Sequence, residues 1–355
     1  MSNRRKLIFH SIIIALIFGC QPKMQHDTDI TLSPESGTSY KSGDLLPTKV
    51  HYESTMHIDS IIYFVDSLKV GSRKDSSILL IKTDSMILGR KTISAKVYHG
   101  GTLQQESTNI ILLAAKPPEQ MTYKIEKIFP HDTSAFTEGL LYQDGYLYES
   151  TGNAGHSTLR KVDLVTGKVI KITKLDTQYF GEGISIVGNK IIMLTYKQPM
   201  KVFIFDKNTF NLLSTFYNYI GEEGWGMTFD GNKLYFDDRT NRIWFLDKNN
   251  YRQKGFIDVC DDKAPIDSIN ELEYINGKLY SNIFEKDYII TIDPKTGAVL
   301  QRANMSKLWP LTQRPAGFDN GENVLNGIAW DEKRKRLFVT GKKWPHLYQI
   351  RFDNK

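Results

Sequence analysis

The sequence predicts an all-β protein, a five-bladed β-propeller preceded by a small immunoglobulin-like β-sandwich. The first observation is a fivefold repeat, in which a short stretch of polar residues and glycine is followed by a turn and an apolar run. The repeats are anchored, 41 to 55 positions apart, at Glu138, Glu182, Glu223, Glu271 and Asn326. The second observation is the content of 18 Tyr and 18 Phe, residues that favour strands. Strand repeats of roughly 40–50 residues are typical of propeller blades, so five repeats indicate five blades.

Residues 1–19 are expected to form an export signal that ends in a lipobox, with Cys20 as the lipidated first residue of the mature chain. A basic start at residues 4–6 precedes an apolar run at residues 7–18, which is short for a permanent membrane-spanning helix. The alternative is an ordinary cleaved signal with an incidental cysteine. Lipidation would hold the protein in a bacterial cell envelope, at the periplasm or cell surface, by its lipid anchor only, with residues 20–29 as a tether.

Charge and cysteine content limit the other functional classes. The formal net charge of +6 falls to about +3 without the three basic residues of the signal, and no basic block remains, so nucleic-acid binding has little support. The chain has two cysteines, so a lipidated Cys20 leaves no disulfide, and Cys260 is expected to be a small buried apolar residue.

Residues 30–115 are predicted to be the immunoglobulin-like sandwich, because short β-rich runs alternate with polar turns. The runs lie at residues 49–52, 60–65, 77–81 and 89–98. This interpretation depends on strand number and alternation alone, because the chain has no Cys…Trp…Cys framework. No catalytic constellation occurs in this region, which favours a spacer or a partner-binding module.

Residues 116–120, with adjacent prolines, are predicted to be a linker, and residues 121–355 the propeller. Too little chain follows residues 346–352 to complete a fourth strand in the last repeat. We therefore expect residues 123–129 to supply the missing outer strand and close the ring between its two ends.

The polar residues of the five repeats are expected to meet at one mouth of the central channel, because the first strand of each blade lines the axis. A converging set is a better candidate site than any single residue. Neighbouring glycines would let a ligand approach closely. The set comprises Glu138, Glu182, Glu223, Glu271, Glu273, Asn270, Asn326 and Trp225.

Six ordered motifs within residues 121–352 also carry a family resemblance. They lie at residues 135–140, 179–183, 224–226, 270–274, 324–331 and 340–342. This region resembles the plant, papaya-type glutaminyl-peptide cyclotransferases and their bacterial relatives. The resemblance implies a five-bladed propeller that converts the N-terminal glutamine of peptides or proteins to pyroglutamate and releases ammonia.

The resemblance also implies roles for single residues. Glu182, in Gly-Glu-Gly, would carry a proton from the attacking to the leaving nitrogen, Lys342 would stabilise the developing oxyanion, and Asn270 would hold the substrate amide. Trp225 would form a flat wall, although an ordinary packed core indole is its alternative. The remaining substrate-binding candidates are Glu138, Phe136, Phe180, Phe284 and Asn326.

Three departures from the family pattern affect this pocket. The family usually has glutamine where Glu138 stands, and the extra carboxylate would raise the pKa of a nearby glutamate. Phe284 and Tyr196 stand where plant members tend to have tryptophan, so the aromatic lining is expected to be smaller or more polar.

No metal is expected in catalysis, because the eight histidines are scattered and no Cys-x-x-Cys occurs. A structural divalent cation on the propeller axis, held by carboxylates or carbonyls, stays an open alternative. A monomer is expected. Two rival functions are a calcium-dependent lactonase-like hydrolase and a non-catalytic propeller that binds peptides or glycans.

Overall fold

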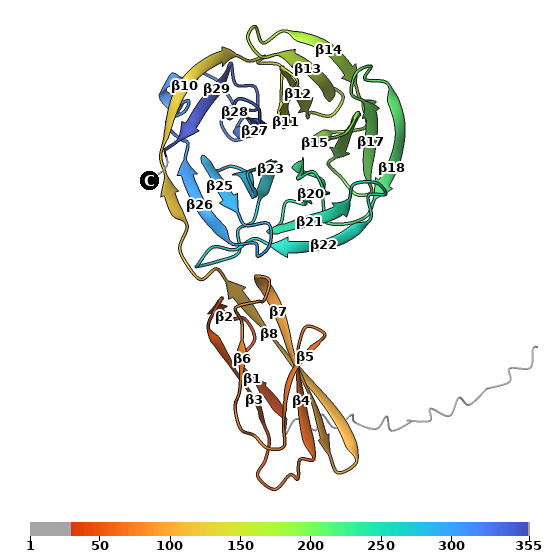
Figure 1. Ribbon diagram of the computed structural model, residues 1–355, viewed down its shortest axis with the longest axis vertical. Helices are drawn as coiled ribbons and strands as arrows, with labels where there is room; N and C mark the ends of the chain where they lie inside the picture. Colours follow the sequence, from red (N-terminus) through yellow and green to blue (C-terminus); the bar gives the residue numbers. More distant parts are fainter. Residues whose placement is uncertain (1–29, 354–355) are drawn as a thin grey trace, which may run out of the picture.

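The computed structural model describes residues 30–353 and is all-β, with one short 3₁₀ helix, η1 (Leu311–Gln313). Two groups of sheets follow one another along the chain, and Figure 1 shows them as an elongated N-terminal part below a ring of sheets. Within residues 30–353, no helix has the length and apolar character needed to cross a membrane. The predicted export signal, the lipidated Cys20 and the tether lie outside the described residues.

The N-terminal part consists of two sheets packed against each other. One has the strand order β1-β3-β6 and the other β2-β8-β7-β4-β5. Side chains alternate between buried and exposed along β7, so every second residue enters the core between the sheets. The strands are β1 (Thr31–Ser33), β2 (Thr38–Lys41), β3 (Leu45–His51), β4 (Ser60–Val65), β5 (Leu68–Arg73), β6 (Leu79–Lys82), β7 (Gly89–His99) and β8 (Thr102–Leu113).

Five sheets form the ring, and each innermost strand contacts the innermost strand of the next sheet. Three sheets contain four consecutive strands: β11 (Thr137–Gln143), β12 (Tyr146–Thr151), β13 (Thr158–Asp163) and β14 (Val169–Lys174); β15 (Gly181–Val187), β16 (Lys190–Thr195), β17 (Met200–Asp206) and β18 (Leu212–Asn218); β19 (Met227–Phe229), β20 (Lys233–Asp237), β21 (Arg242–Asp247) and β22 (Gln253–Asp258). The fourth contains β23 (Ile269–Ile275), β24 (Lys278–Ile283), β25 (Tyr288–Ile292) and β26 (Val299–Asn304). In Figure 1, β11, β15, β23 and β27 (Leu325–Asp331) lie nearest the centre.

The fifth sheet joins the two ends of the ring. Its order is β10-β29-β28-β27, in which β10 (Tyr123–Pro130) pairs antiparallel with β29 (His346–Phe352) beside β28 (Arg336–Gly341). The prediction that residues 123–129 supply the missing outer strand is therefore confirmed. The predicted linker also contributes a strand, since β9 (Glu119–Met121) pairs in parallel with β26.

The two parts meet at a buried apolar junction around Cys260. Leu88, Leu112, Leu113 and Ala114 of the N-terminal part pack with this cysteine, which is free and fully buried, as predicted. Burial raises the pKa of its thiol to about 12. Main-chain hydrogen bonds cross the junction as well, from Leu88 N to Thr296 O (3.1 Å) and from Ala114 N to Asp261 O (3.0 Å).

Candidate active site

One side chain from each of the five innermost strands or the turn before it reaches the centre of the ring. These side chains occupy equivalent positions in the five sheets. Each lies two residues before a residue of the innermost strand that pairs with the second strand of the same sheet. The five pairs are Leu140↔Glu149, Ile184↔Met193, Met227↔Phe236, Leu272↔Ser281 and Ile328↔Val339. In four of the five sheets the register shifts at this point, as in a β-bulge, which re-aims a side chain. The five side chains, all buried, are Glu138, Glu182, Trp225, Asn270 and Asn326.

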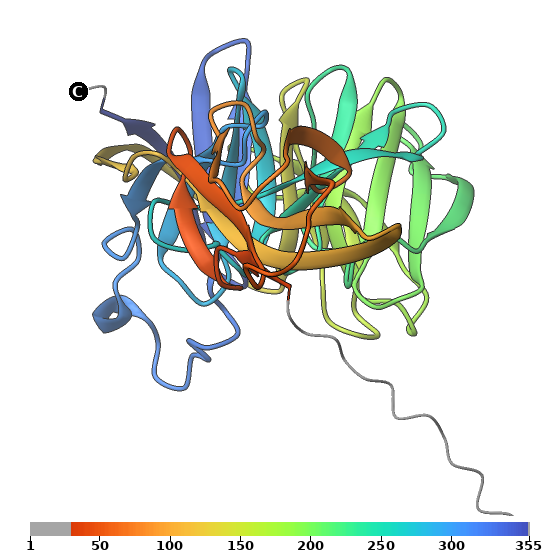
Figure 2. The same cartoon turned by 90° about the horizontal axis from the view of Figure 1, so that it is seen from below.

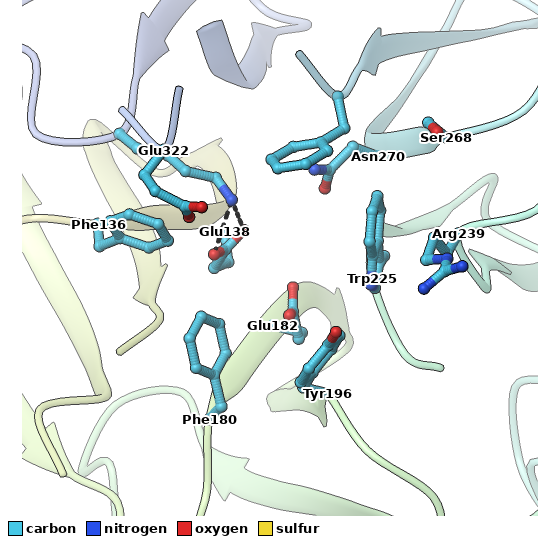
Figure 3. Close-up of a pocket in the computed structure, with 12 residues that line it drawn as sticks. Phe136, Glu138, Phe180, Glu182, Tyr196, Trp225, Arg239, Ser268, Asn270 and Glu322 are labelled. Carbon is cyan, nitrogen blue, oxygen red and sulfur yellow. Dashed lines mark hydrogen bonds and ion pairs between the residues drawn. The ribbon is translucent and has the colours of Figure 1, made fainter. Parts of the chain in front are cut away.

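A pocket of about 470 Å³ opens at this end of the innermost strands. Of the nine predicted catalytic and substrate-binding residues, eight line it; the full lining is Phe136, Glu138, Phe180, Glu182, Tyr196, Trp225, Arg239, Ser268, Asn270, Phe284, Glu322 and Lys342. Figure 3 shows them facing one another from opposite sides. The ninth, Asn326, lies behind the lining and donates from Nδ2 to Glu138 Oε2 (3.3 Å) and Thr137 O (2.9 Å).

Aromatic rings make two walls of the pocket. Phe136 and Phe180 meet edge to face with centroids 6.2 Å apart, and Trp225 meets Phe284 in the same way at 5.5 Å. The Trp225 indole N–H donates to Glu223 Oε2 (3.1 Å), so the ring is fixed in place while its side borders the cavity. Such walls suit the aliphatic part of a small polar side chain.

Lys342 forms a buried ion pair with Glu138. Its Nζ lies 2.8 Å from Glu138 Oε2, and the two side chains are only 6% and 2% exposed. Burial raises the pKa of Glu138 to about 7, although the lysine charge acts in the opposite direction. Lys342 Nζ also lies 4.6 Å from the centre of the Phe136 ring, so this cation stands inside the pocket.

The Glu182 carboxyl points into the pocket, and no hydrogen bond within residues 30–353 engages it. Burial raises its pKa well above the usual carboxyl range, the Glu138 charge adds to this effect, and the Lys342 charge opposes it. Its main chain is fixed, because Ser150 Oγ donates to Glu182 O (2.6 Å) from the neighbouring strand. Glu182 is thus a buried acid with a free carboxyl on a rigid strand.

Two carboxylates of the expected set lie elsewhere, so their predicted place at the mouth is wrong. Glu271 accepts hydrogen bonds from Leu140 N (3.1 Å) and Ile328 N (2.8 Å), which ties β23 to β11 and β27 below the pocket. Glu273 accepts from Trp330 N (2.9 Å) in the same way. Glu271 and Glu273 stand two residues apart on one face of β23, and this face is turned toward backbone groups of the adjoining sheets. Glu223 lies at the rim of the pocket, where its carboxylate accepts the hydrogen bond from the Trp225 indole.

A second buried pair supports the segments that carry Glu138 and Lys342. His131 bonds through Nδ1 to Trp344 O (2.7 Å) and through Nε2 to Glu149 Oε1 (2.9 Å), and Thr137 Oγ1 donates to the same Glu149 oxygen (2.7 Å). Burial lowers the pKa of His131, but the Glu149 charge and hydrogen bond outweigh this effect, so the pKa is raised.

Three lining residues carried no signal in the repeat pattern. Arg239 and Ser268 come from turns beside β20 and β23, and Glu322 comes from the long loop before β27. That loop, drawn in blue, stands out from one face of the ring in Figure 2. Arg239 lies 3.6 Å from Glu223 at the rim. Loop residues differ from repeat to repeat, so only the fold brings them to the pocket.

Metal-ligand residues do not gather in the described chain. Among residues 30–353, no three His, Cys, Asp or Glu side chains are grouped as they would be around a metal ion. The lining of the pocket offers buried acids, a buried cation, an amide and aromatic walls.

Comparison with known proteins identifies the family of this chain. The family described as glutamine cyclotransferase matches residues 94–352. The chain is 39% identical over 224 residues to a glutaminyl-peptide cyclotransferase of Arabidopsis thaliana, covering 63% of this chain and 69% of the plant protein. It is also similar to the crystal structure of the Myxococcus xanthus glutaminyl cyclase, with a TM-score of 0.60, 32% identity, and coverage of 66% of this chain and 98% of that one. The chain belongs to the glutamine cyclotransferase family.

Proposed function

We propose that this protein is a glutaminyl-peptide cyclotransferase, which converts an N-terminal glutamine to pyroglutamate and releases ammonia. The observation that carries the proposal is the free, buried Glu182 carboxyl, aimed into an aromatic-walled pocket in a chain of this family. The pocket volume of about 470 Å³ suits one terminal residue and the start of a peptide.

The reaction is a ring closure within the substrate. The α-amine attacks the γ-carboxamide carbon, a C–N bond forms, and the former carboxamide nitrogen leaves as ammonia. Attack within one molecule already has much of the advantage of proximity. A free α-amine has a pKa of about 7.7–8.0, so a useful fraction is neutral near pH 7.

Glu182 moves the proton between the two nitrogens. As a carboxylate it takes a proton from the attacking amine, and as an acid it gives that proton to the departing nitrogen. One group can serve both steps, and a raised pKa suits it because a shuttle works best near the operating pH.

Asn270 and Lys342 complete the site. Asn270 Oδ1 is buried and has no hydrogen-bond partner in the described residues, so it is free to accept from the substrate amide. Lys342, beside Glu138, places positive charge where the carboxamide oxygen becomes negative. Phe136, Phe180, Trp225 and Phe284 border the glutamine side chain.

We further propose that the ring is a five-bladed β-propeller over residues 121–355. The five sheets around one centre and the strand pairing of its two ends support this architecture. The two packed sheets of residues 30–115 support an immunoglobulin-like sandwich, which acts as a spacer or partner-binding module.

The anchor, the location and the assembly are proposed from the sequence. Lipidation of Cys20 would hold a monomer in a bacterial cell envelope. Catalysis would need no metal, and a structural divalent cation on the axis would be outside the reaction. Mass spectrometry of the mature N-terminus tests the lipid.

The direct test of function is release of ammonia from a glutamine-initiated dipeptide, with pyroglutamyl product followed by mass spectrometry. We expect both products in equal amounts, unaffected by a chelator. Loss of turnover with the chelator would favour the lactonase-like hydrolase. Binding of the dipeptide without ammonia would favour a non-catalytic binding protein.

A further inference from the structure

Asp237 is a buried carboxyl group that the proposed reaction does not use. It ends β20 and is 0% exposed, and the main-chain amides of Gly226 and Arg239 that lie near its oxygens fall outside hydrogen-bond geometry. A buried, unpaired carboxylate is costly, so the position needs a physical explanation.

The equivalent residue in the first sheet of the ring is Ser150. Ser150 follows Glu149, which pairs with Leu140, and Asp237 follows Phe236, which pairs with Met227 at the same point of its sheet. Ser150 Oγ donates to the main-chain oxygen of Glu182 in the next sheet (2.6 Å). In the first sheet, the residue at this position thus supports a central residue of the neighbouring sheet.

Asn270 has the same position relative to Asp237 as Glu182 has relative to Ser150. It is the central residue of the sheet that follows β19–β22. A Cβ added to Gly226 would lie 2.6 Å from Asp237 Oδ2 and 2.4 Å from Asn270 O, so both oxygens border the same point. The corresponding Cβ on Gly139 would lie 2.7 Å from Ser150 Oγ.

The Asn270 oxygen is available as an acceptor. Ser281 Oγ lies 3.3 Å from it but has one proton, and its shorter contact is with Asn282 O (2.8 Å). A carboxyl oxygen and a carbonyl oxygen can attract each other only through a shared proton or a cation.

We propose that Asp237 is a neutral carboxylic acid whose O–H donates to the main-chain oxygen of Asn270, and so positions that residue as Ser150 positions Glu182. The inference rests on the proposed function, because Asn270 is the group that holds the substrate amide. Asp237 is a positioning residue, since it acts on the substrate only through Asn270.

The electrostatic surroundings keep this acid protonated. Burial raises the pKa of Asp237 well above the usual range and the Asp238 charge adds to it, whereas the nearby amides of Gly226 and Arg239 oppose them. Glu182 and Glu271 are the other acids that sense its charge. A neutral Asp237 therefore adds no negative charge beside the proton shuttle.

The test compares Asp237→Ser and Asp237→Ala, with Ser150→Ala as the matched control. Asp237→Ser restores the hydroxyl found in the equivalent position and should keep the rate of ammonia release within about threefold, whereas Asp237→Ala should lose roughly tenfold to a hundredfold by displacing Asn270. Ser150→Ala should show a loss of similar size. Equal losses in Asp237→Ser and Asp237→Ala would overturn the role as a donor.

The protonation state of Asp237 is measured separately from enzymatic activity. An infrared difference spectrum, wild type minus Asp237→Ser at pH 7, should contain the carbonyl stretch of a protonated carboxylic acid. A carboxylate band there, or a divalent cation bound by the wild type and lost in Asp237→Ser, would refute the neutral acid. This spectrum decides the question even if the wild type releases no ammonia, an outcome that would reject the proposed function instead.

Discussion

The buried charge of the pocket depends on three neighbouring groups, Glu138, Lys342 and Glu182, since Arg239 and Glu322 in the lining are exposed. Glu138 stands where the family resemblance implies glutamine, and in this chain it neutralises the pocket lysine. Two acids and one cation then share a buried volume. The proton affinity of Glu182 is set by this arrangement as well as by its own burial.

Replacing Glu138 by Gln should shift the acid limb of the pH–rate profile to lower pH. The substitution removes a negative charge near Glu182 and frees the Lys342 charge, and both changes lower the pKa of the shuttle. Glu182 must be ionised to accept the first proton, so the variant should be active at more acidic pH. Profiles of kcat/KM for the two proteins would show this, and a limb that stays in place or moves upward would contradict it.

Motifs in the sequence predicted most of the site at the level of single residues. Eight of the nine predicted residues line the pocket. Four of them occupy the position that each repeat places at the centre, and the other four were implied by the family resemblance. Partners could not be predicted in the same way. The Lys342–Glu138 pair and the inward turn of Glu271 depend on distances across the ring, which no local pattern encodes.

At the scale of strands, Glu271 occupies a position that is held by glycine in the other four sheets of the ring. Gly139, Gly183, Gly226 and Gly327 stand at the equivalent positions of the other sheets, and only β23 places a side chain there. Its carboxyl oxygens bond to main-chain amides of β11 and β27. One side chain therefore links three innermost strands beneath the pocket.

Replacing Glu271 by Ala should lower the free energy of unfolding by roughly 2–4 kcal/mol, because two buried N–H groups would lose their acceptors. Glu271→Gln keeps one acceptor and should lose less. Urea unfolding followed by tryptophan fluorescence measures both. An unchanged midpoint for Glu271→Ala would show that the carboxyl does not hold these strands together.

Strand repeats and turn signals predicted the sheets, and the shortage of chain in the last repeat predicted the pairing of β10 with β29. The parallel pairing of β9 with β26 was not predictable, because adjacent prolines in that region favour a linker. The loop that brings Glu322 to the pocket has no repeat counterpart, so its position follows only from the folded chain.

Across the whole molecule, buried acids with raised pKa values make stability depend on pH. Burial raises the pKa of Glu273 to about 8, from 4.5, and raises that of Glu271 well above the same starting value. Between pH 4.5 and these values the folded chain holds protons that the unfolded chain has released. His131, whose pKa is also raised, acts in the same direction above pH 6.5.

The free energy of unfolding should therefore fall as pH rises from about 5 to 8, on the order of 1 kcal/mol per pH unit for each fully buried acid. Urea midpoints at several pH values would measure the slope. Glu273→Gln should flatten it, since this variant has no proton to lose. A midpoint that increases over the same window would contradict the assignment of these acids as protonated when folded.

The central claim, that Glu182 carries the proton between the two nitrogens, is tested most directly by ammonia release from a glutamine-initiated dipeptide with Glu182→Gln. The variant should lose about 10²–10⁴-fold in kcat, with the unfolding midpoint and dipeptide binding retained, because an amide cannot exchange the proton. The exposed Glu222, outside the pocket, gives the matched control Glu222→Gln, which should be fully active. A Glu182→Gln rate close to that of the wild type would contradict the account.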